Sequence, residues 1–187
     1  LDFLFEVLHK HFDLSNLKEV TLEANPDDLS LHYLQYLVKT PINRLSIGIQ
    51  SFNNTHLTFM NRAHQADEAI RCVQTAQELG LSQISIDLIY GIPGMSDEIW
   101  KQNIDTAIGL GIPHISSYCL TIEPKTYFGV QMQKNHFKQV ADEDSERQFL
   151  DLLNFTESAG FEQYEISNFA KPNFYALHNT NYWKDAP

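Results

Sequence analysis

The stretches RLSIGIQSF (residues 44–52) and ISIDLIYGIPG (residues 84–94) decide the fold, because both alternate apolar and small polar residues as a half-buried β-strand does. Isoleucine and leucine fall on one face of each predicted strand, while serine and glycine fall on the other. The polar face ends at Gln50 in the first stretch and carries Asp87 in the second. We therefore expect two similar strands that each present a polar side chain near the carboxyl end.

Strand patterns of this kind alternate with helical ones along the chain. Residues 65–79 have apolar residues at helical spacing and are followed by Gly80, and Ser96 has the place of an N-cap for another helix. Consecutive βα units with short connections imply parallel strands joined by right-handed crossovers. The predicted strands cover residues 18–23, 44–50, 83–90, 114–121 and 161–167.

The difference between the two strand faces separates the possible α/β architectures. An open doubly wound sheet is covered by helices on both faces and is apolar on both, whereas a barrel has helices only on its outside. An ordinary closed barrel fills its interior with bulky branched side chains. Small polar residues on the inner face, with Thr21 and Glu23 in the first strand, indicate a wider, incomplete barrel with an open, wettable interior that holds a ligand.

Composition argues against several classes of protein. The 187 residues are 43% hydrophobic, enough for the core of one domain, and the net charge of −11 argues against binding to nucleic acid or to an anionic membrane surface. No apolar run is long enough for stable membrane insertion and there is no signal-peptide pattern, so a cytoplasmic protein is expected. Neither Cys72 nor Cys119 has a neighbour at metal-ligand spacing; both are expected to be buried free thiols, and no metal site is predicted in this chain.

Glu23, Gln50 and Asp87 lie on the inner face near the carboxyl ends of successive strands, where parallel α/β folds bind ligands. Two carboxylates and an amide provide the donors and acceptors that the vicinal hydroxyls of a ribose require. Two other roles remain open: an acid–base pair formed by the carboxylates, or capping of loop amides by each side chain. Arg62, which follows the second strand, has the chemistry to bind a ligand carboxylate through two hydrogen bonds.

Several motifs together resemble the radical S-adenosylmethionine (SAM) proteins related to oxygen-independent coproporphyrinogen III oxidase. The resemblance covers nearly the whole chain and implies a partial (β/α)6 radical SAM barrel. It also implies that Gln50, Asp87 and Glu23 hold the nucleoside of SAM and that Arg62 binds its methionine carboxylate. The motifs are LEANPDDLS (22–30), INRLSIGIQSFNNTHLTFMNRAH (42–64), ISIDLIYGIPG (84–94), HISSYCLTIEP (114–124) and YEISNFAKPNFYALHNTNYW (164–183).

Two features of that family do not occur in this sequence. The family coordinates a four-iron four-sulfur cluster through Cys-x3-Cys-x2-Cys and places a Gly-Gly-Gly-Thr-Pro segment at the methionine amine. We therefore expect a fragment that lacks the first two βα units and covers about the last four strands, with the barrel in residues 1–170 and the start of a C-terminal region in residues 171–187. Without the cluster, which belongs to the full-length protein, the fragment is not expected to cleave SAM reductively. The exposed edge of its first strand, residues 18–23, predicts self-association.

The segment HNTNYW (residues 178–183) resembles the HNxxYW motif of the HemW branch, which is linked to heme binding and to delivery of heme to apoproteins. His178 has the chemistry of an axial heme ligand, and Tyr182 and Trp183 offer flat surfaces to a porphyrin; the alternative is a structural histidine beside core aromatics. The resemblance thus implies an iron–sulfur protein of porphyrin metabolism that acts as a heme chaperone for an unidentified client. A coproporphyrinogen III oxidase, which decarboxylates propionates through a 5′-deoxyadenosyl radical, is the alternative within the family. A barrel lyase or isomerase that uses Glu23 and Asp87 as acid and base is a remote alternative.

Overall fold

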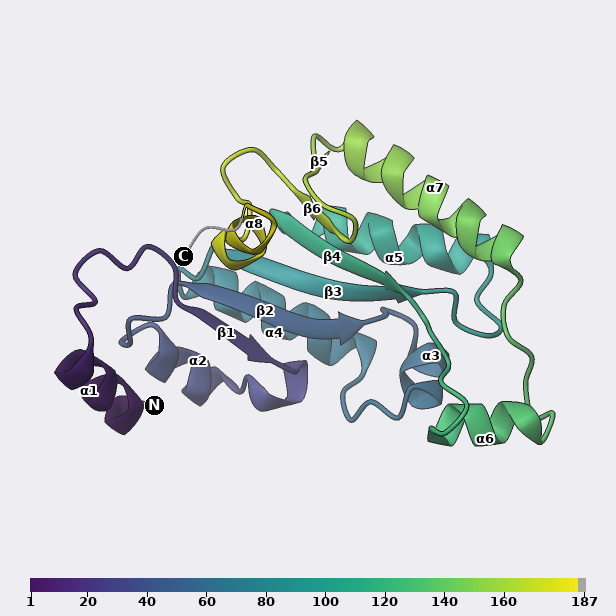
Figure 1. Cartoon of the computed structure of the whole chain (residues 1–187), viewed down its shortest axis with the longest axis horizontal. Coiled ribbons are helices and arrows are strands. Elements are labelled where there is room, and N and C mark those ends of the chain that lie inside the picture. Colours follow the sequence, from purple (N-terminus) through teal and green to yellow (C-terminus); the bar gives the residue numbers. More distant parts are fainter. Residues whose placement is uncertain (185–187) are drawn as a thin grey trace.

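Six strands form one sheet, and most helices pack on a single face of it, in the computed structural model, which describes residues 1–184 (Figure 1). The strand order is β1-β2-β3-β4-β6-β5. The strands are β1 (Thr21–Ala24), β2 (Arg44–Gln50), β3 (Ile84–Tyr90), β4 (His114–Cys119), β5 (Glu162–Gln163) and β6 (Asn168–Ala170). The helices are α1 (Asp2–His11), η1 (Pro26–Asp28, a 3-10 turn), α2 (Leu31–Leu37), α3 (Asn54–Phe59), α4 (Ala66–Glu78), α5 (Asp97–Gly109), α6 (Tyr127–Gln133), α7 (Asp142–Ser158) and α8 (Leu177–Trp183).

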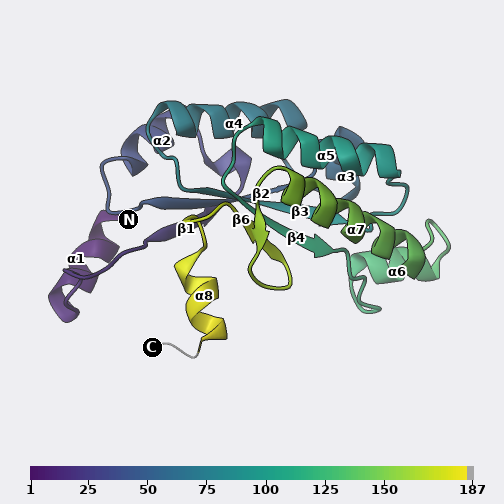
Figure 2. The same cartoon turned by 90° about the horizontal axis from the view of Figure 1, so that it is seen from above.

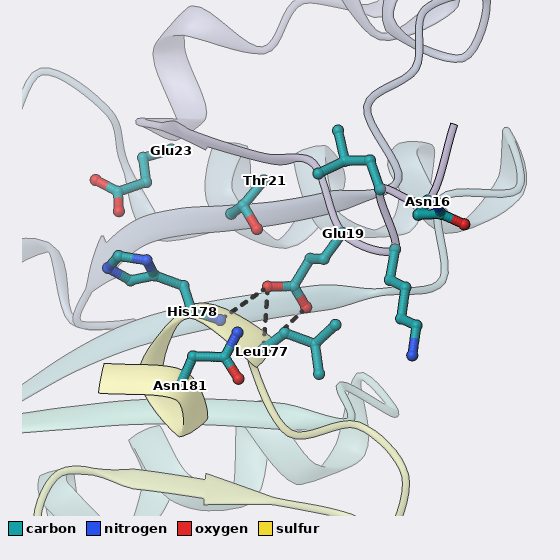
Figure 3. Close-up of a pocket in the computed structure, with 9 residues that line it drawn as sticks. Asn16, Glu19, Thr21, Glu23, Leu177, His178 and Asn181 are labelled. Carbon is teal, nitrogen blue, oxygen red and sulfur yellow. Dashed lines mark hydrogen bonds between the residues drawn. The ribbon is translucent and has the colours of Figure 1, made fainter. Parts of the chain in front are cut away.

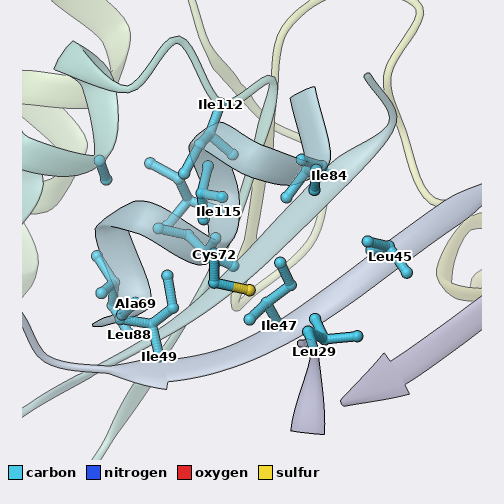
Figure 4. Packing of buried hydrophobic residues seen from close by; sticks show 14 of the residues in the cluster. Leu29, Leu45, Ile47, Ile49, Ala69, Cys72, Ile84, Leu88, Ile112 and Ile115 are labelled. Atoms are coloured by element: carbon cyan, nitrogen blue, oxygen red, sulfur yellow. The ribbon is translucent and has the colours of Figure 1, made fainter. Parts of the chain in front are cut away.

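Strands β1 to β4 are parallel and adjacent in chain order, as the repeated βα pattern predicts. Helices α2, α4 and α5 lie between successive strands in the chain and cover one face of the sheet (Figure 2). Apolar side chains of the central strands, such as Leu45, Ile47 and Ile84, point to that face and are fully buried in the core (Figure 4). The predicted α/β architecture, with one apolar face covered by helices, is confirmed.

Strand β2 contains a bulge where its polar face ends. Ile47 pairs with Ile86 and Gln50 pairs with Leu88, so β2 has one residue more than β3 between the two pairs. Gln50 has a φ of 69°, a left-handed conformation that is uncommon for residues other than glycine. Bulges of this kind redirect a side chain at the end of a strand, and here the redirected residue is one of the predicted ligand-binding residues.

The last two strands do not continue the parallel array. The sequence predicts one strand over residues 161–167, but the structure has the short strands β5 and β6, and β6 runs antiparallel to β4. The Glu165 carboxylate accepts hydrogen bonds from the Ser167 amide and from the Asn168 side chain. The prediction of a fifth parallel strand was wrong because this local bonding reverses the chain between β5 and β6.

Most other boundaries lie close to their predicted places. The first strand begins at Thr21 and not at residue 18, because the Asn43 side chain bonds to the backbone before it. The predicted helix over residues 65–79 is α4, and Gly80 after it has a φ of 92°. Ser96 caps α5 as expected, since its hydroxyl accepts a hydrogen bond from the Ile99 amide at 3.3 Å.

The two cysteines differ in exposure. Cys72 is a buried free thiol in α4, as predicted, and burial raises its pKa to about 11. Cys119 is also free but is exposed, so the prediction of a buried thiol was wrong for this residue. It ends β4, where the chain leaves the helix-covered sheet. None of the helices within residues 1–184 is long and apolar enough to cross a membrane.

The segment that carries α8 lies on the face of the sheet opposite α2, α4 and α5 (Figure 2). The Phe174 carbonyl in this segment accepts a hydrogen bond from the guanidinium of Arg44, which is 2% exposed. This segment therefore covers part of the polar face at its amino end, beside a cavity that Arg44 and His114 also line. Strand β1 is an edge strand, so self-association through it stays a prediction.

Candidate functional site

A cavity of about 250 Å³ lies on the polar face of the sheet, and both predicted carboxylates line it. Glu23 comes from β1 and Asp87 from β3, so two strands that are not adjacent meet across the same space. Burial raises the pKa of Asp87 to about 6, and the nearby Glu23 carboxylate adds to this rise; Ser116 and Arg62 oppose it. The site therefore holds a carboxylate that is half-protonated just below neutral pH.

Gln50 and Arg62 converge on the same face around a glycine. A methyl group added at Gly48 would stand 2.9 Å from Nε2 of Gln50, 3.2 Å from Nη2 of Arg62 and 3.3 Å from Oδ1 of Asn25. Nη2 of Arg62 donates to that Asn25 oxygen and, at 3.0 Å, to the Gly48 carbonyl. Any side chain at position 48 would therefore force the polar side chains around it to shift.

The structure brings the four predicted SAM-binding residues to one region. Asp87 lies close enough to Glu23 and Arg62 for both charges to affect its pKa, and Arg62 lies beside Gln50 around Gly48. Nε and Nη1 of Arg62 make no hydrogen bond within residues 1–184, so the guanidinium retains donors for a ligand carboxylate.

Two residues of this region were missed by reasoning from sequence. Asn25 orients Arg62, although the two are 37 positions apart in the chain. Nε2 of His64, a buried residue, bonds to the Ile49 carbonyl at 3.1 Å, directly before the left-handed Gln50. Both lie in stretches that carry the family resemblance, LEANPDDLS and NRAH, but no local pattern assigns them a contact.

The set is chemically suited to a nucleoside that carries an amino-acid group. Asp87 and Glu23 are acceptors for ribose hydroxyls, the Gln50 amide both donates and accepts, and Arg62 pairs with a carboxylate. The close approach at Gly48 and the partly exposed acceptors along the cavity fit the binding of SAM. An acid–base role for the two carboxylates remains compatible with the raised pKa of Asp87.

His178, on α8, lies on the same polar face of the sheet as Glu23 and Asp87. It lines the cavity that contains Asp87 and also a larger groove of about 690 Å³ between residues 16–19, β1 and α8. Its imidazole points along β1 toward Glu23 (Figure 3). The larger groove has a volume typical of small-molecule sites.

The described residues do not fit an iron–sulfur cluster. Residues 1–184 contain no group of three or more histidine, cysteine or acidic side chains placed to hold a metal ion. Cys72 is buried in the core under the opposite face of the sheet, and Cys119 ends β4.

Comparison with known proteins places these residues in a family. Residues 1–107 match the radical SAM superfamily. The heme chaperone HemW of Bacillus subtilis is 37% identical over 185 residues, which are 99% of this chain and 48% of that protein. The mitochondrial radical S-adenosyl methionine domain-containing protein 1 of Danio rerio is 34% identical over 97% of this chain and 41% of that protein. The chain thus spans about half the length of the curated relatives it matches.

Solved structures give the same grouping. The coproporphyrinogen III oxidase HemN of Escherichia coli, a radical SAM enzyme, superposes with a TM-score of 0.74 and 27% identity, over 92% of this chain and 39% of that one. The archaeal Elp3 of Methanocaldococcus infernus superposes with a TM-score of 0.62 and 23% identity over 76% of this chain, which shows a common fold alone. The six-stranded mixed sheet therefore matches part of a radical SAM structure.

Proposed function

Because this chain belongs to the radical SAM superfamily and, within it, to the HemW and HemN family, we propose that it is the SAM-binding part of a heme chaperone. The family implies SAM and a four-iron four-sulfur cluster as cofactors of the whole protein. The curated relatives named heme chaperones reach 37% identity, compared with 27% for the coproporphyrinogen III oxidase. That difference favours the chaperone over the oxidase.

In this proposal, SAM lies across the carboxyl ends of β1 to β3. Gln50, Asp87 and Glu23 bind its nucleoside, and Arg62, held by Asn25, binds its methionine carboxylate. In this proposal the residues of this chain bind and orient SAM, and any transfer of an electron to SAM would require a cluster held by residues elsewhere in the whole protein.

The position of His178 is the single observation that carries the heme part of the proposal. This residue lines both the cavity of the SAM-binding residues and the larger groove, so a heme held by it would lie next to SAM. Tyr182 and Trp183 follow on the same short helix and are 73% and 57% exposed, which leaves their rings free to pack on a porphyrin. A neutral imidazole is a suitable axial ligand to heme iron.

The experiment is a hemin titration of the 187-residue chain followed by absorption spectroscopy. We expect a Soret shift that is lost in His178→Ala and kept in His32→Ala, since His32 is an exposed histidine on α2. Equal binding by both variants would rule out His178 as the ligand. Absence of any shift in the unmodified chain would count against the heme part and leave the SAM site to be tested by titration with SAM.

The oxidase is kept as the second candidate because the solved structure with a TM-score of 0.74 has that activity. An anaerobic assay of the whole protein with coproporphyrinogen III separates the two functions. Formation of protoporphyrinogen would favour the oxidase, and binding of heme without turnover would favour the chaperone. The client apoprotein would then be the next unknown.

A further inference from the structure

The first turn of α8 is tied to the sheet by a carboxylate from the other end of the chain. Oε1 and Oε2 of Glu19 accept hydrogen bonds from the Leu177 amide at 3.1 and 3.2 Å, and Oε1 also accepts one from the His178 amide at 3.4 Å. Figure 3 shows this carboxylate between β1 and the start of α8. These amides belong to the first turn of a helix, where no intrahelical acceptor exists for them.

Arg44 holds the Glu19 carboxylate in place. Its Nε donates to Glu19 Oε2 at 3.1 Å, its Nη1 donates to the Ser85 hydroxyl at 3.3 Å, and its Nη2 donates to the Phe174 carbonyl at 2.6 Å. One buried guanidinium therefore joins β2, β3, the segment before β1 and the segment that leads into α8. The planar fork of arginine suits such a junction, because its donors point in fixed directions.

A partly buried pair, Tyr164 and His114, completes the attachment. The Tyr164 hydroxyl accepts a hydrogen bond from the Ala176 amide at 3.3 Å and shares a 2.7 Å hydrogen bond with Nε2 of His114. His114 is 1% exposed, and its burial, with the Arg44 charge, lowers its pKa to about 3, so the imidazole stays neutral. Three successive amides of the chain, at residues 176–178, are thus bonded to side chains from elsewhere in the fold.

We propose that Glu19, Arg44 and Tyr164 are positioning residues that fix the first turn of α8 and so set the His178 imidazole at the junction of the two cavities. The consequence for heme rests on the proposed function, whereas the anchoring of α8 does not. The helix has seven residues and none of them is buried, so its own packing holds it weakly. The contacts of Glu19, Arg44 and Tyr164 therefore hold the helix in place where its own packing does not.

The test uses Glu19→Ala, with Glu146→Ala as a control on the exposed surface of α7. Hydrogen exchange of the Leu177 and His178 amides should become at least about tenfold faster in Glu19→Ala, since hydrogen bonds to a charged acceptor are lost. The amides of β2 and β3 should keep their exchange rates. Unchanged exchange at residues 177 and 178 would overturn the anchor.

A second variant removes the donor and keeps the buried charges. Leu177→Pro deletes the amide that bonds to Glu19, and proline is accepted there because Leu177 is the first helical residue and Ala176 has extended angles of −67° and 121°. Leu177→Ala controls for the side chain. His178 exchange should rise in Leu177→Pro but not in Leu177→Ala, and adding Leu177→Pro to Glu19→Ala should change little further.

Hemin titration of the same variants separates this inference from the proposed function. We expect Glu19→Ala and Leu177→Pro to weaken the His178-dependent Soret shift by about tenfold, while Glu146→Ala binds as the unmodified chain does. Faster exchange without any hemin binding in the unmodified chain would support the anchor and count against heme. Normal hemin affinity in both variants would overturn the positioning role.

Discussion

The two ends of the polar face of the sheet are built in opposite ways. At the amino end, Arg44 and His114 are 2% and 1% exposed and bond to groups of the same chain. At the carboxyl end, Gln50 and Asp87 are only partly buried, although Asp87 lines the same cavity as Arg44 and His114. The polar groups of the amino end are buried and bonded within the chain, whereas those of the carboxyl end stay partly exposed.

The difference shows where the fold gives up stability for binding. Gln50 holds a left-handed conformation, and such residues usually cost free energy. Burial keeps the pKa of Asp87 well above its ordinary value, which means that its charged form is destabilised in the folded state. At neutral pH, the buried residues of the amino end carry neither of these two costs. We therefore interpret both costs at the carboxyl end as signs of a binding role.

The largest expected effect comes from replacing Arg44, the buried charge at the amino end. Arg44→Met removes a buried charge and leaves Glu19, Ser85 and the Phe174 carbonyl without their donor. We expect the free energy of unfolding to fall by about 3–5 kcal/mol, the usual cost of breaking a buried ion pair. Urea denaturation measures it, with Arg71→Met on the exposed face of α4 as the control. Equal losses in the two variants would show that the amino end is no more constrained than the surface.

The next effect is the pH dependence of stability that Asp87 causes at the carboxyl end. The folded chain keeps a proton on Asp87 up to a pKa of about 6, whereas the unfolded chain loses it near the ordinary aspartate pKa of 3.8. Wild-type stability from this group therefore falls as pH rises through that window. Asp87→Asn should raise the free energy of unfolding above pH 6 by roughly 1–3 kcal/mol.

His114, at the amino end, changes the pH dependence of stability in the opposite direction. The pKa of His114 is about 3 in the folded chain, below the ordinary histidine pKa of 6.5. The unfolded chain therefore binds more protons between these two values, and the free energy of unfolding rises with pH there. In the wild-type chain the two groups oppose each other over the window of Asp87. Thermal melts from pH 4 to 7 should therefore show a steeper rise of stability with pH in Asp87→Asn. An unchanged slope would show that Asp87 is not destabilised by burial.

The smallest effect concerns the shape of the ligand-binding end. Gly48→Ala places a methyl group 2.9 Å from Nε2 of Gln50 and 3.2 Å from Nη2 of Arg62, so both side chains must shift. We expect affinity for SAM, measured by calorimetry, to fall about tenfold, which corresponds to roughly 1.4 kcal/mol. Gly109→Ala is the matched control, because nothing lies within 4 Å of its added methyl group. Equal affinity in both variants would place SAM away from Gly48.

Features with a short repeat could be predicted from the sequence, and features that join distant residues could not. The alternation of the strands and their chain order placed Glu23 and Asp87 on one face, because a period of two and parallel crossovers determine that geometry. The bulge at Gln50 has no such signature. The Arg44 contacts with Glu19 and Phe174 join residues 25 and 130 positions apart, and nothing local in the sequence links those residues.

The bond between Glu19 and the Leu177 amide joins residues 158 positions apart. Strands β1 to β4 each dock on the strand made just before, so the sheet can grow in the order of the chain. The attachment of α8 instead closes a loop of nearly the whole chain, and we expect this step to come late in folding because its entropy cost must first be offset by the contacts of the sheet. If His178 binds heme as proposed, we expect its site to become ordered only after strands β1 to β4 have assembled.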